Sequence, residues 1–220
     1  YQLILNTEEV FYGAHGGVSG TIWHFWWMKY AYHNGLSGNF SPFISAPFGF
    51  DFYLIPMQSF EIYPAFLLTL LTNEIAAYNF FVIFQFLISG IGGYFLVYHL
   101  TRERFSGVFA GVVMAFSPYI LVHSLEHITL ITTGWVSLFT LYLLKWNETK
   151  GYRDALLAGI FFSLVTIFSY EYAVFTSILI VTFLLFKAWQ KIGSKDIRDC
   201  MKNLFEFIKD TFIIPWKSIL

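Results

Sequence analysis

The stretch Ala76–Leu100, AAYNFFVIFQFLISGIGGYFLVYHL, decides the fold of this chain. It runs for 25 residues without Asp, Glu, Lys or Arg and then ends at the charged sequence TRER, residues 101–104. A bilayer core is about 30 Å thick and takes roughly 20 apolar residues as a helix, because a helix satisfies its own backbone hydrogen bonds. We therefore expect this stretch to span a membrane.

Further apolar stretches follow it. Residues 105–122 and 128–144 are each long enough for a span, and residues 155–186 are apolar except for SYEY at 169–172. As one helix, the last stretch would be about 48 Å long, which requires strong tilt. We interpret it as two short spans that turn at Glu171. The predicted fold class is all-α, a polytopic transmembrane helical bundle with five spans.

The composition supports a membrane protein. Of 220 residues, 57% are hydrophobic and only 12% charged, whereas soluble domains carry about 25% charged residues. The net charge of -1 provides no field for a nucleic acid, so we expect none as a partner. The single Cys200 excludes a disulfide framework and a cysteine zinc cluster. P-loop, GxGxxG, GxSxG and HExxH motifs are absent.

The positions of the basic residues predict the orientation. Lys and Arg are enriched in the cytoplasmic loops of membrane proteins. Ten of the 13 basic residues fall in three segments, at 102–104, 145–153 and 187–202, and the first sixty residues contain only Lys29. We expect those three segments inside the cell, and the amino-terminal loop outside the plasma membrane.

This orientation divides the chain into three parts. Residues 1–75 form a large outer loop with juxtamembrane helices, and residues 76–189 form the five-span bundle. Residues 190–220 form a cytoplasmic amphipathic segment and the start of a further span. Because the chain opens with Tyr1 and has no signal peptide, we expect it to be a fragment of a longer protein.

The stretch 52–71 is apolar but is interrupted by Pro56, Glu61 and Pro64. If it crossed the membrane, Arg102 would fall on the same side as the Lys-poor loop. We expect an interfacial or re-entrant helix that belongs to the outer loop.

Aromatic residues are concentrated in the segment 21–33, TIWHFWWMKYAYH. Trp23, Trp26, Trp27 and Tyr30 follow the i, i+3, i+4, i+7 spacing of one helix face. Indole rings favour the headgroup level of a membrane, so a helix lying on the membrane surface is the simpler interpretation. The alternative is that these four rings also line a groove that binds a sugar or a lipid-linked substrate.

Residues 34–51 are rich in Gly, Pro, Ser and Asn. These residues favour turns, so we expect a chain of turns rather than a helix or strand. Asp51 at its end either caps a following helix or belongs to a functional site.

A polar group follows the sequence FSPY at 116–119. His123, Glu126 and His127 would share one side of a helix, an arrangement that suits a divalent metal ion or proton transfer. Hydrogen bonding at the membrane interface is the simpler interpretation of these residues, and we favour it. Glu171, between two tyrosines, is expected at the same end of the spans.

Small residues recur at four-residue spacing within the predicted spans. Ser89 and Gly93 form one such pair, and Gly107, Gly111 and Ala115 form a second series. This spacing lets helix backbones approach closely in lipid; the alternative is that these glycines are simply tolerated, as glycine is in membrane helices generally.

The order of these motifs resembles the amino-terminal part of prokaryotic polytopic proteins of the GT-C glycosyltransferase superfamily. The resemblance rests on GTIWHFWW (20–27), NGLSGNFSPF (34–43), APFGFDF (46–52), the stretch 76–100, AGVVMAFSPYILVHSLEH (110–127) and FSYEY (168–172). It is strongest between Ala76 and His127.

The resemblance implies a hexosyltransferase that transfers a sugar from a polyprenyl-phosphate donor to an acceptor on the outer face. It implies a catalytic site with a carboxylate on the outer face, for which the candidates are Asp51, Glu126 and His127, with Glu8 and Glu9 as weaker ones. His127 matches a recurrent histidine of the family. Glu171 and the aromatic residues of segment 21–33 are the candidates for substrate binding.

One position departs from the family pattern. An acidic residue is expected near Gly17 or Val18, where this chain has HGGVSG at 15–20. Its absence favours the alternative of a non-catalytic multi-pass membrane protein, such as a transporter of lipid-linked glycans or an assembly subunit. The scarcity of charges within the spans argues against ion-coupled transport.

Overall fold

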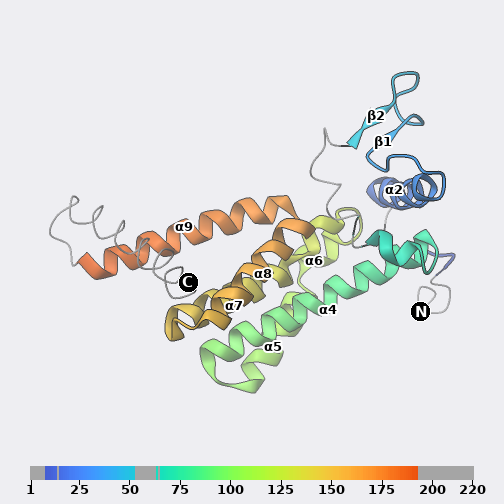
Figure 1. Cartoon of the computed structure of the whole chain (residues 1–220). Helices are drawn as coiled ribbons and strands as arrows, with labels where there is room; N and C mark the ends of the chain where they lie inside the picture. Colours follow the sequence, from blue (N-terminus) through green and yellow to red (C-terminus); the bar gives the residue numbers. More distant parts are fainter. Residues whose placement is uncertain (1–7, 14, 53–62, 64, 193–220) are drawn as a thin grey trace. The chain divides into compact units, whose positions relative to one another are not determined.

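The computed structural model describes residues 8–13, 15–52, 63 and 65–192. It divides into two compact units, residues 1–173 and 174–220. The described elements are almost all helical, with one two-stranded sheet (Figure 1). In chain order they are α2 (His15–His33), β1 (Phe40–Ser41), β2 (Phe50–Asp51), α4 (Glu74–Thr101), α5 (Arg104–Ala115), α6 (Pro118–His123), η2 (Ile128–Ile131), α7 (Thr133–Thr149), α8 (Tyr152–Phe168) and α9 (Tyr170–Ile192).

Four helical segments of the described chain are long and apolar enough to cross a membrane. They are Glu74–Thr101, Arg104–His123, Ile128–Thr149 and Tyr170–Gln190. This confirms a multi-pass helical protein. One predicted span is not among these four. It is the fourth in chain order and corresponds to α8, which has 17 residues and a length of about 26 Å. The count of five spans therefore stays a prediction.

The segment Arg104–His123 is not one continuous helix. α5 ends at Ala115, and the side chain of Ser117 accepts a hydrogen bond from the amide of Ile120 to begin α6. Pro118 occupies the first turn of α6, where its missing N–H costs nothing. The helix is therefore interrupted at Ser117-Pro118, and the residues after the break form the separate helix α6.

α4 is the centre of the first unit, with α5 packed on one side and α7 on the other. Backbones approach closely at both contacts. A methyl group on Gly111 would lie 2.7 Å from the carbonyl oxygen of Gly90, and one on Gly92 would lie 2.6 Å from that of Gly134. Ser89 donates to the carbonyl of Ile131 at 3.2 Å. The predicted small-residue positions thus lie at helix contacts.

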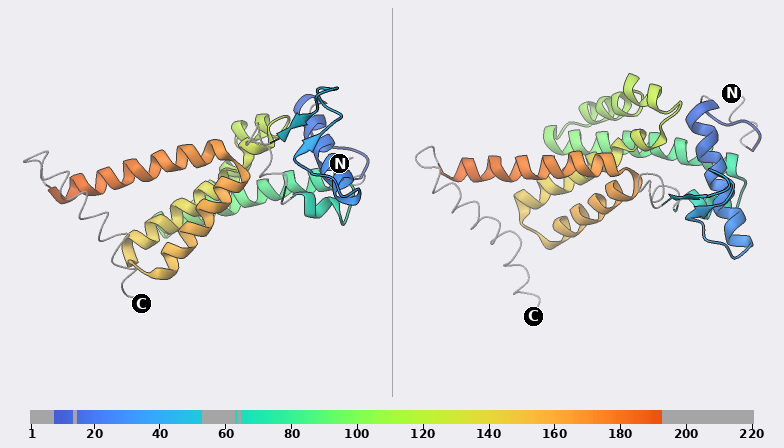
Figure 2. Two further views of the ribbon diagram at one scale, coloured as in Figure 1. Left: turned by 45° about the horizontal axis from the view of Figure 1, so that its top comes forward. Right: turned by 90° about the horizontal axis from the view of Figure 1, so that it is seen from above.

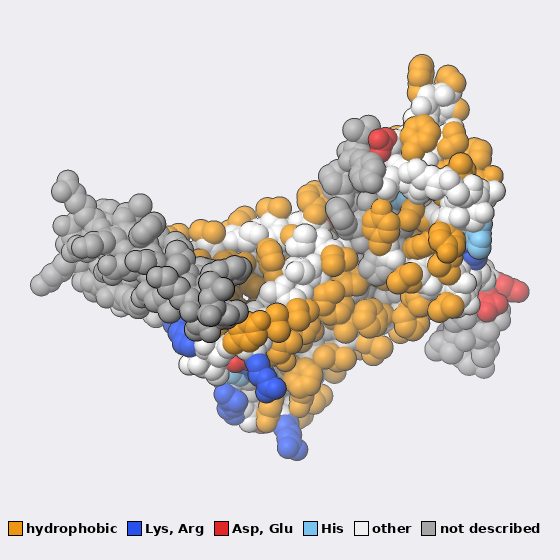
Figure 3. Space-filling model, viewed as in Figure 1, with side chains coloured by type: hydrophobic (Ala, Val, Ile, Leu, Met, Phe, Trp, Pro, Cys, Tyr) orange, Lys and Arg blue, Asp and Glu red, His pale blue; other side chains and the backbone are white. Residues whose placement is uncertain are grey.

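The α4–α5 turn and the α7–α8 turn lie at the same end of this unit. His99 Nε2 of α4 lies 3.3 Å from Glu148 Oε1 of α7. Lys and Arg side chains gather at this end (Figure 3). Arg102 and Lys150 are the C-cap residues of α4 and α7, where a positive charge complements the helix dipole. The basic residues 102–153 therefore share one end, as the orientation rule predicted; the sidedness itself stays a prediction.

At the opposite end, α2 lies across α4 rather than along it (Figure 2). Lys29 of α2 donates to the carbonyl of Thr72 at 3.2 Å and pairs with Glu74 at 3.3 Å. These contacts hold the middle of α2 at the first turn of α4. A surface helix was expected in this segment, and its placement at the end of a span agrees with that.

The predicted chain of turns after α2 is wrong at two points. Phe40 pairs with Asp51 and Ser41 with Phe50 in a short antiparallel hairpin. Two-residue strands leave no alternating pattern in the sequence, so turn chemistry dominates the segment. Asp51 lies in β2, and the residues that a cap would serve, 53–62, lie outside the described part, as do residues 193–220 of the predicted cytoplasmic segment.

Candidate functional site

The end of the bundle beside α2 carries a layer of polar side chains. Tyr172, in the first turn of α9, donates its hydroxyl hydrogen to the carbonyl of Leu130 at 2.7 Å. Tyr119 Oη lies 3.0 Å from Tyr172 Oη. Because the Tyr172 hydrogen is already used, Tyr119 is the donor to Tyr172. This chain of hydrogen bonds joins α6, η2 and the start of α9.

His123 and His127 extend this layer. Their ring centroids are 5.9 Å apart, and the His123 ring lies 4.4 Å from that of Tyr119. The prediction that they share a helix face is wrong, because α6 ends at His123. A turn brings them together instead, with the amide of His127 donating to the carbonyl of His123 at 2.7 Å.

Both carboxylates predicted for this region lie at this end. Glu126 and His127 are exposed in the turn between α6 and η2. Glu171 Oε2 accepts a hydrogen bond from the buried Ser169 hydroxyl at 2.9 Å. Exposed carboxylate and imidazole groups therefore stand where two spans end, together with the tyrosine pair.

The predicted metal site receives no support from the described residues. No group of three His, Cys, Asp or Glu among them is close enough to hold a metal ion. The carboxylate and imidazole side chains at this site can transfer protons and form hydrogen bonds.

Residues 10–13 are docked on this polar layer. Asn79 of α4 accepts from the amide of Tyr12 at 2.9 Å and donates to the carbonyl of Val10 at 2.7 Å. Tyr12 Oη lies 3.1 Å from Ser124 Oγ. Asn79 is fully buried, and its place inside an apolar stretch was the signal that could have marked it as a docking residue.

The packing around Gly17 leaves no room for the acidic residue that the family resemblance leads one to expect near Gly17 or Val18. A side chain at Gly17 would overlap the backbone carbonyl of Glu126, and Val18 beside it is fully buried. Neither position can present a carboxylate in this packing. The carboxylate next to this contact is instead that of Glu126.

The aromatic residues of α2 divide into two groups. Trp27 is completely buried with Ala31 and Phe52, and its indole N–H donates to the carbonyl of Gly38 at 3.0 Å. Trp23 stacks on Trp27. Trp27 is therefore part of the loop core in this conformation.

Trp26, Tyr30 and Phe43 form an accessible group of rings that contact one another. Trp26 stacks on Tyr30 at 5.3 Å, and the Phe43 ring of the hairpin lies 6.4 Å from Trp26 and 6.1 Å from Tyr30. We call Trp26, Tyr30 and Phe43 the aromatic face. It offers flat, partly exposed surface beside the polar end of the bundle.

His24 of α2 is buried against Phe52, with ring centroids 4.2 Å apart. Removal from water disfavours the charged imidazole and lowers the pKa of His24 from 6.5 to about 4. This side chain is therefore neutral at physiological pH and acts as a core group.

The remaining candidates lie elsewhere in the loop. Asp51 is half-buried in β2. Glu8 and Glu9 are exposed, and the Glu8 carbonyl accepts from Asn73 Nδ2 at 3.1 Å. Of the candidate residues, His123, His127 and Glu171 have direct side-chain contacts at the bundle end, where the structure adds Tyr119 and Tyr172.

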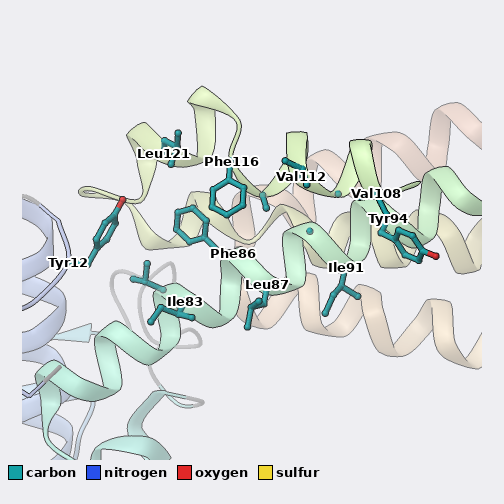
Figure 4. Close-up of a pocket in the computed structure, with 14 residues that line it drawn as sticks. Tyr12, Ile83, Phe86, Leu87, Ile91, Tyr94, Val108, Val112, Phe116 and Leu121 are labelled. Carbon is teal, nitrogen blue, oxygen red and sulfur yellow. The ribbon is translucent and has the colours of Figure 1, made fainter. Parts of the chain in front are cut away.

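An apolar groove of about 670 Å³ runs between α4 and α5 (Figure 4). Tyr12 lies at one end of the groove and Tyr94 at the other. Apolar side chains such as Leu87 and Val112 line the wall between them. The groove belongs to helices that qualify as membrane spans.

Comparison with known proteins identifies no relative: no family model, no curated protein and no solved structure matches the chain.

Proposed function

We propose that this chain is part of a membrane glycosyltransferase that transfers a sugar from a polyprenyl-phosphate donor to an acceptor on the outer face of the plasma membrane. The observation that carries the proposal is the group of Glu126, His127, His123 and Tyr119 at the end of the spans. A lipid-linked phosphate would lie at this depth, because its headgroup cannot enter the hydrocarbon.

Two other features suit such a substrate. The aromatic face presents rings on which the apolar face of a sugar stacks. The groove between α4 and α5 is lined by apolar side chains, which suits the hydrocarbon chain of the donor.

The chemistry requires a base and a good leaving group. The carboxylate of Glu126 takes the proton of an acceptor hydroxyl as the oxygen attacks the anomeric carbon of the sugar. The bond from that carbon to the phosphate oxygen breaks, and polyprenyl phosphate leaves with the electron pair. His127 donates a hydrogen bond to the phosphate as it departs.

The test is sugar transfer by the full-length protein with a polyprenyl-phosphate-linked sugar. We expect Glu126→Gln and His127→Ala each to lower kcat/KM at least tenfold, since general acid–base groups contribute about 10²–10⁴. Asp51→Asn tests the other loop carboxylate. Glu103→Gln, an exposed acid at the opposite end, is the control and should leave turnover unchanged. Unchanged turnover in all three site variants would reject the site.

The closed packing at Gly17 favours a second candidate, a non-catalytic membrane protein that binds or moves lipid-linked glycans. This alternative predicts that the protein binds the donor and releases no polyprenyl phosphate, even with an acceptor present.

A further inference from the structure

The tip of the β1–β2 hairpin, residues 42–48, is an exposed apolar surface. Its sequence is PFISAPF, and residues 42, 43 and 45–48 are all exposed. Phe48 is 89% exposed and Phe43 59%. Large apolar side chains with this much exposure mark a surface that contacts another apolar phase.

The segment that carries the tip has no charge. Residues 34–50 contain no Asp, Glu, Lys, Arg or His. Protein–protein interfaces are enriched in Arg as well as in aromatic residues, and a polar rim surrounds their apolar core. The neutral tip lacks Arg, whereas neutral and aromatic side chains are those that enter the headgroup region of a bilayer.

Contacts place the tip at the end of the spans. Trp27 donates to the carbonyl of Gly38, and the Phe43 ring packs at 5.6 Å on Trp27. α2 is in turn held to the first turn of α4 through Lys29 and Glu74. The hairpin is therefore connected to the first turn of α4 through two sets of contacts, one between the hairpin and α2 and one between α2 and α4. This turn is where α4 would leave the hydrocarbon.

The tip also continues the exposed apolar surface of helices that qualify as membrane spans. Phe43 contacts Trp26 and Tyr30, and the spans below expose apolar side chains such as Phe80 and Ile83 of α4. A band of Trp, Tyr and Phe at the end of apolar spans matches the aromatic belt at a membrane interface.

We propose that the hairpin tip inserts Phe48 and Phe43 into the interfacial region of the bilayer leaflet at this end of the spans, as a lateral membrane anchor for the outer loop. The ligand is the lipid surface itself. The anchor fixes the height of α2, and of Trp26 and Tyr30 on it, relative to the membrane. The proposal does not depend on sugar transfer.

The experiment uses a nitroxide spin label at position 48 of the full-length protein in lipid nanodiscs. Phe48→Cys is made in a Cys200→Ser background, and Glu9→Cys is the matched control, an exposed acid in the same loop. We expect the label at 48 to collide mainly with oxygen, which concentrates in lipid, and little with a water-soluble nickel complex. The label at 9 should show the reverse preference.

Two results would overturn the proposal. The first is nickel accessibility at position 48 equal to that at position 9. The second is protection at position 48 that persists in detergent and rises with protein concentration, which would show a second copy of the chain on the tip. A Phe48→Asp variant provides a second measurement, because it should shift a label placed at Phe43 towards water.

Discussion

Replacing Gly134 with leucine is expected to prevent stable packing of α7 on α4. Any side chain at Gly134 would overlap the backbone of Ile88 and Ser89, and a backbone contact cannot rotate away as a flexible side chain can. Overpacking in a close-packed interior costs about 1–3 kcal/mol or more. We expect the helix content of the purified protein in detergent to be lost at a clearly lower temperature, as measured by circular dichroism.

Gly159→Leu provides the matched control. Gly159 lies in α8, and a side chain built there meets nothing within 4 Å. The same substitution should therefore leave the unfolding temperature near that of the wild type. Equal unfolding temperatures for the two variants would contradict the packing of α4 against α7.

Gly17→Asp is expected to detach the first turns of α2 from the turn at 125–126. It introduces the acid that the family resemblance leads one to expect, at a position where the carbonyl of Glu126 leaves no room. An acid near a helix amino terminus typically gains about 0.3–1 kcal/mol, less than the upper part of the overlap cost of about 1–3 kcal/mol. The overlap with the Glu126 carbonyl should therefore outweigh the favourable interaction of the new acid with the helix dipole, and the first turns of α2 should detach.

Hydrogen exchange of the backbone amides in residues 8–20 measures this detachment. A loss of about 2 kcal/mol corresponds to roughly 30-fold faster exchange through local opening. Gly20→Asp carries the same charge on the same helix, in open space, and should leave exchange unchanged. Slow exchange in Gly17→Asp would show that this end of α2 does not pack on Glu126.

The spans were predictable because hydrocarbon imposes a strong rule on sequence. Long stretches without charge, closed by basic clusters, predicted α4, α7 and the α8–α9 region close to their observed bounds. A turn within the last apolar stretch was also predicted, at Glu171; the break lies two residues earlier, at Ser169 between α8 and α9, and Glu171 belongs to the first turn of α9. The two-residue strands of the hairpin were not, because pairing so short depends on the packing of Phe52 against α2 rather than on local pattern.

The candidate site was predictable in part. Position in the chain was enough to expect His123, Glu126 and His127 at the end of a span. Helical spacing then gave the wrong local geometry, because Pro118 starts a helix too short to include His127. The hydrogen bonds of Tyr119, Tyr172 and Asn79 join residues 42 to 69 positions apart, and no local signal reports such pairs.

The central claim is that the polar layer and the outer loop lie on one side of the membrane and the basic turns on the other. Labelling of single cysteines with a membrane-impermeant maleimide in intact cells tests it directly. In a Cys200→Ser background, cysteines at Glu9 and Glu126 should be labelled from outside. Cysteines at Glu103 and Arg153, exposed residues of the basic turns, should be labelled only after permeabilisation. Labelling at positions 126 and 153 from the same side of intact cells would contradict the account.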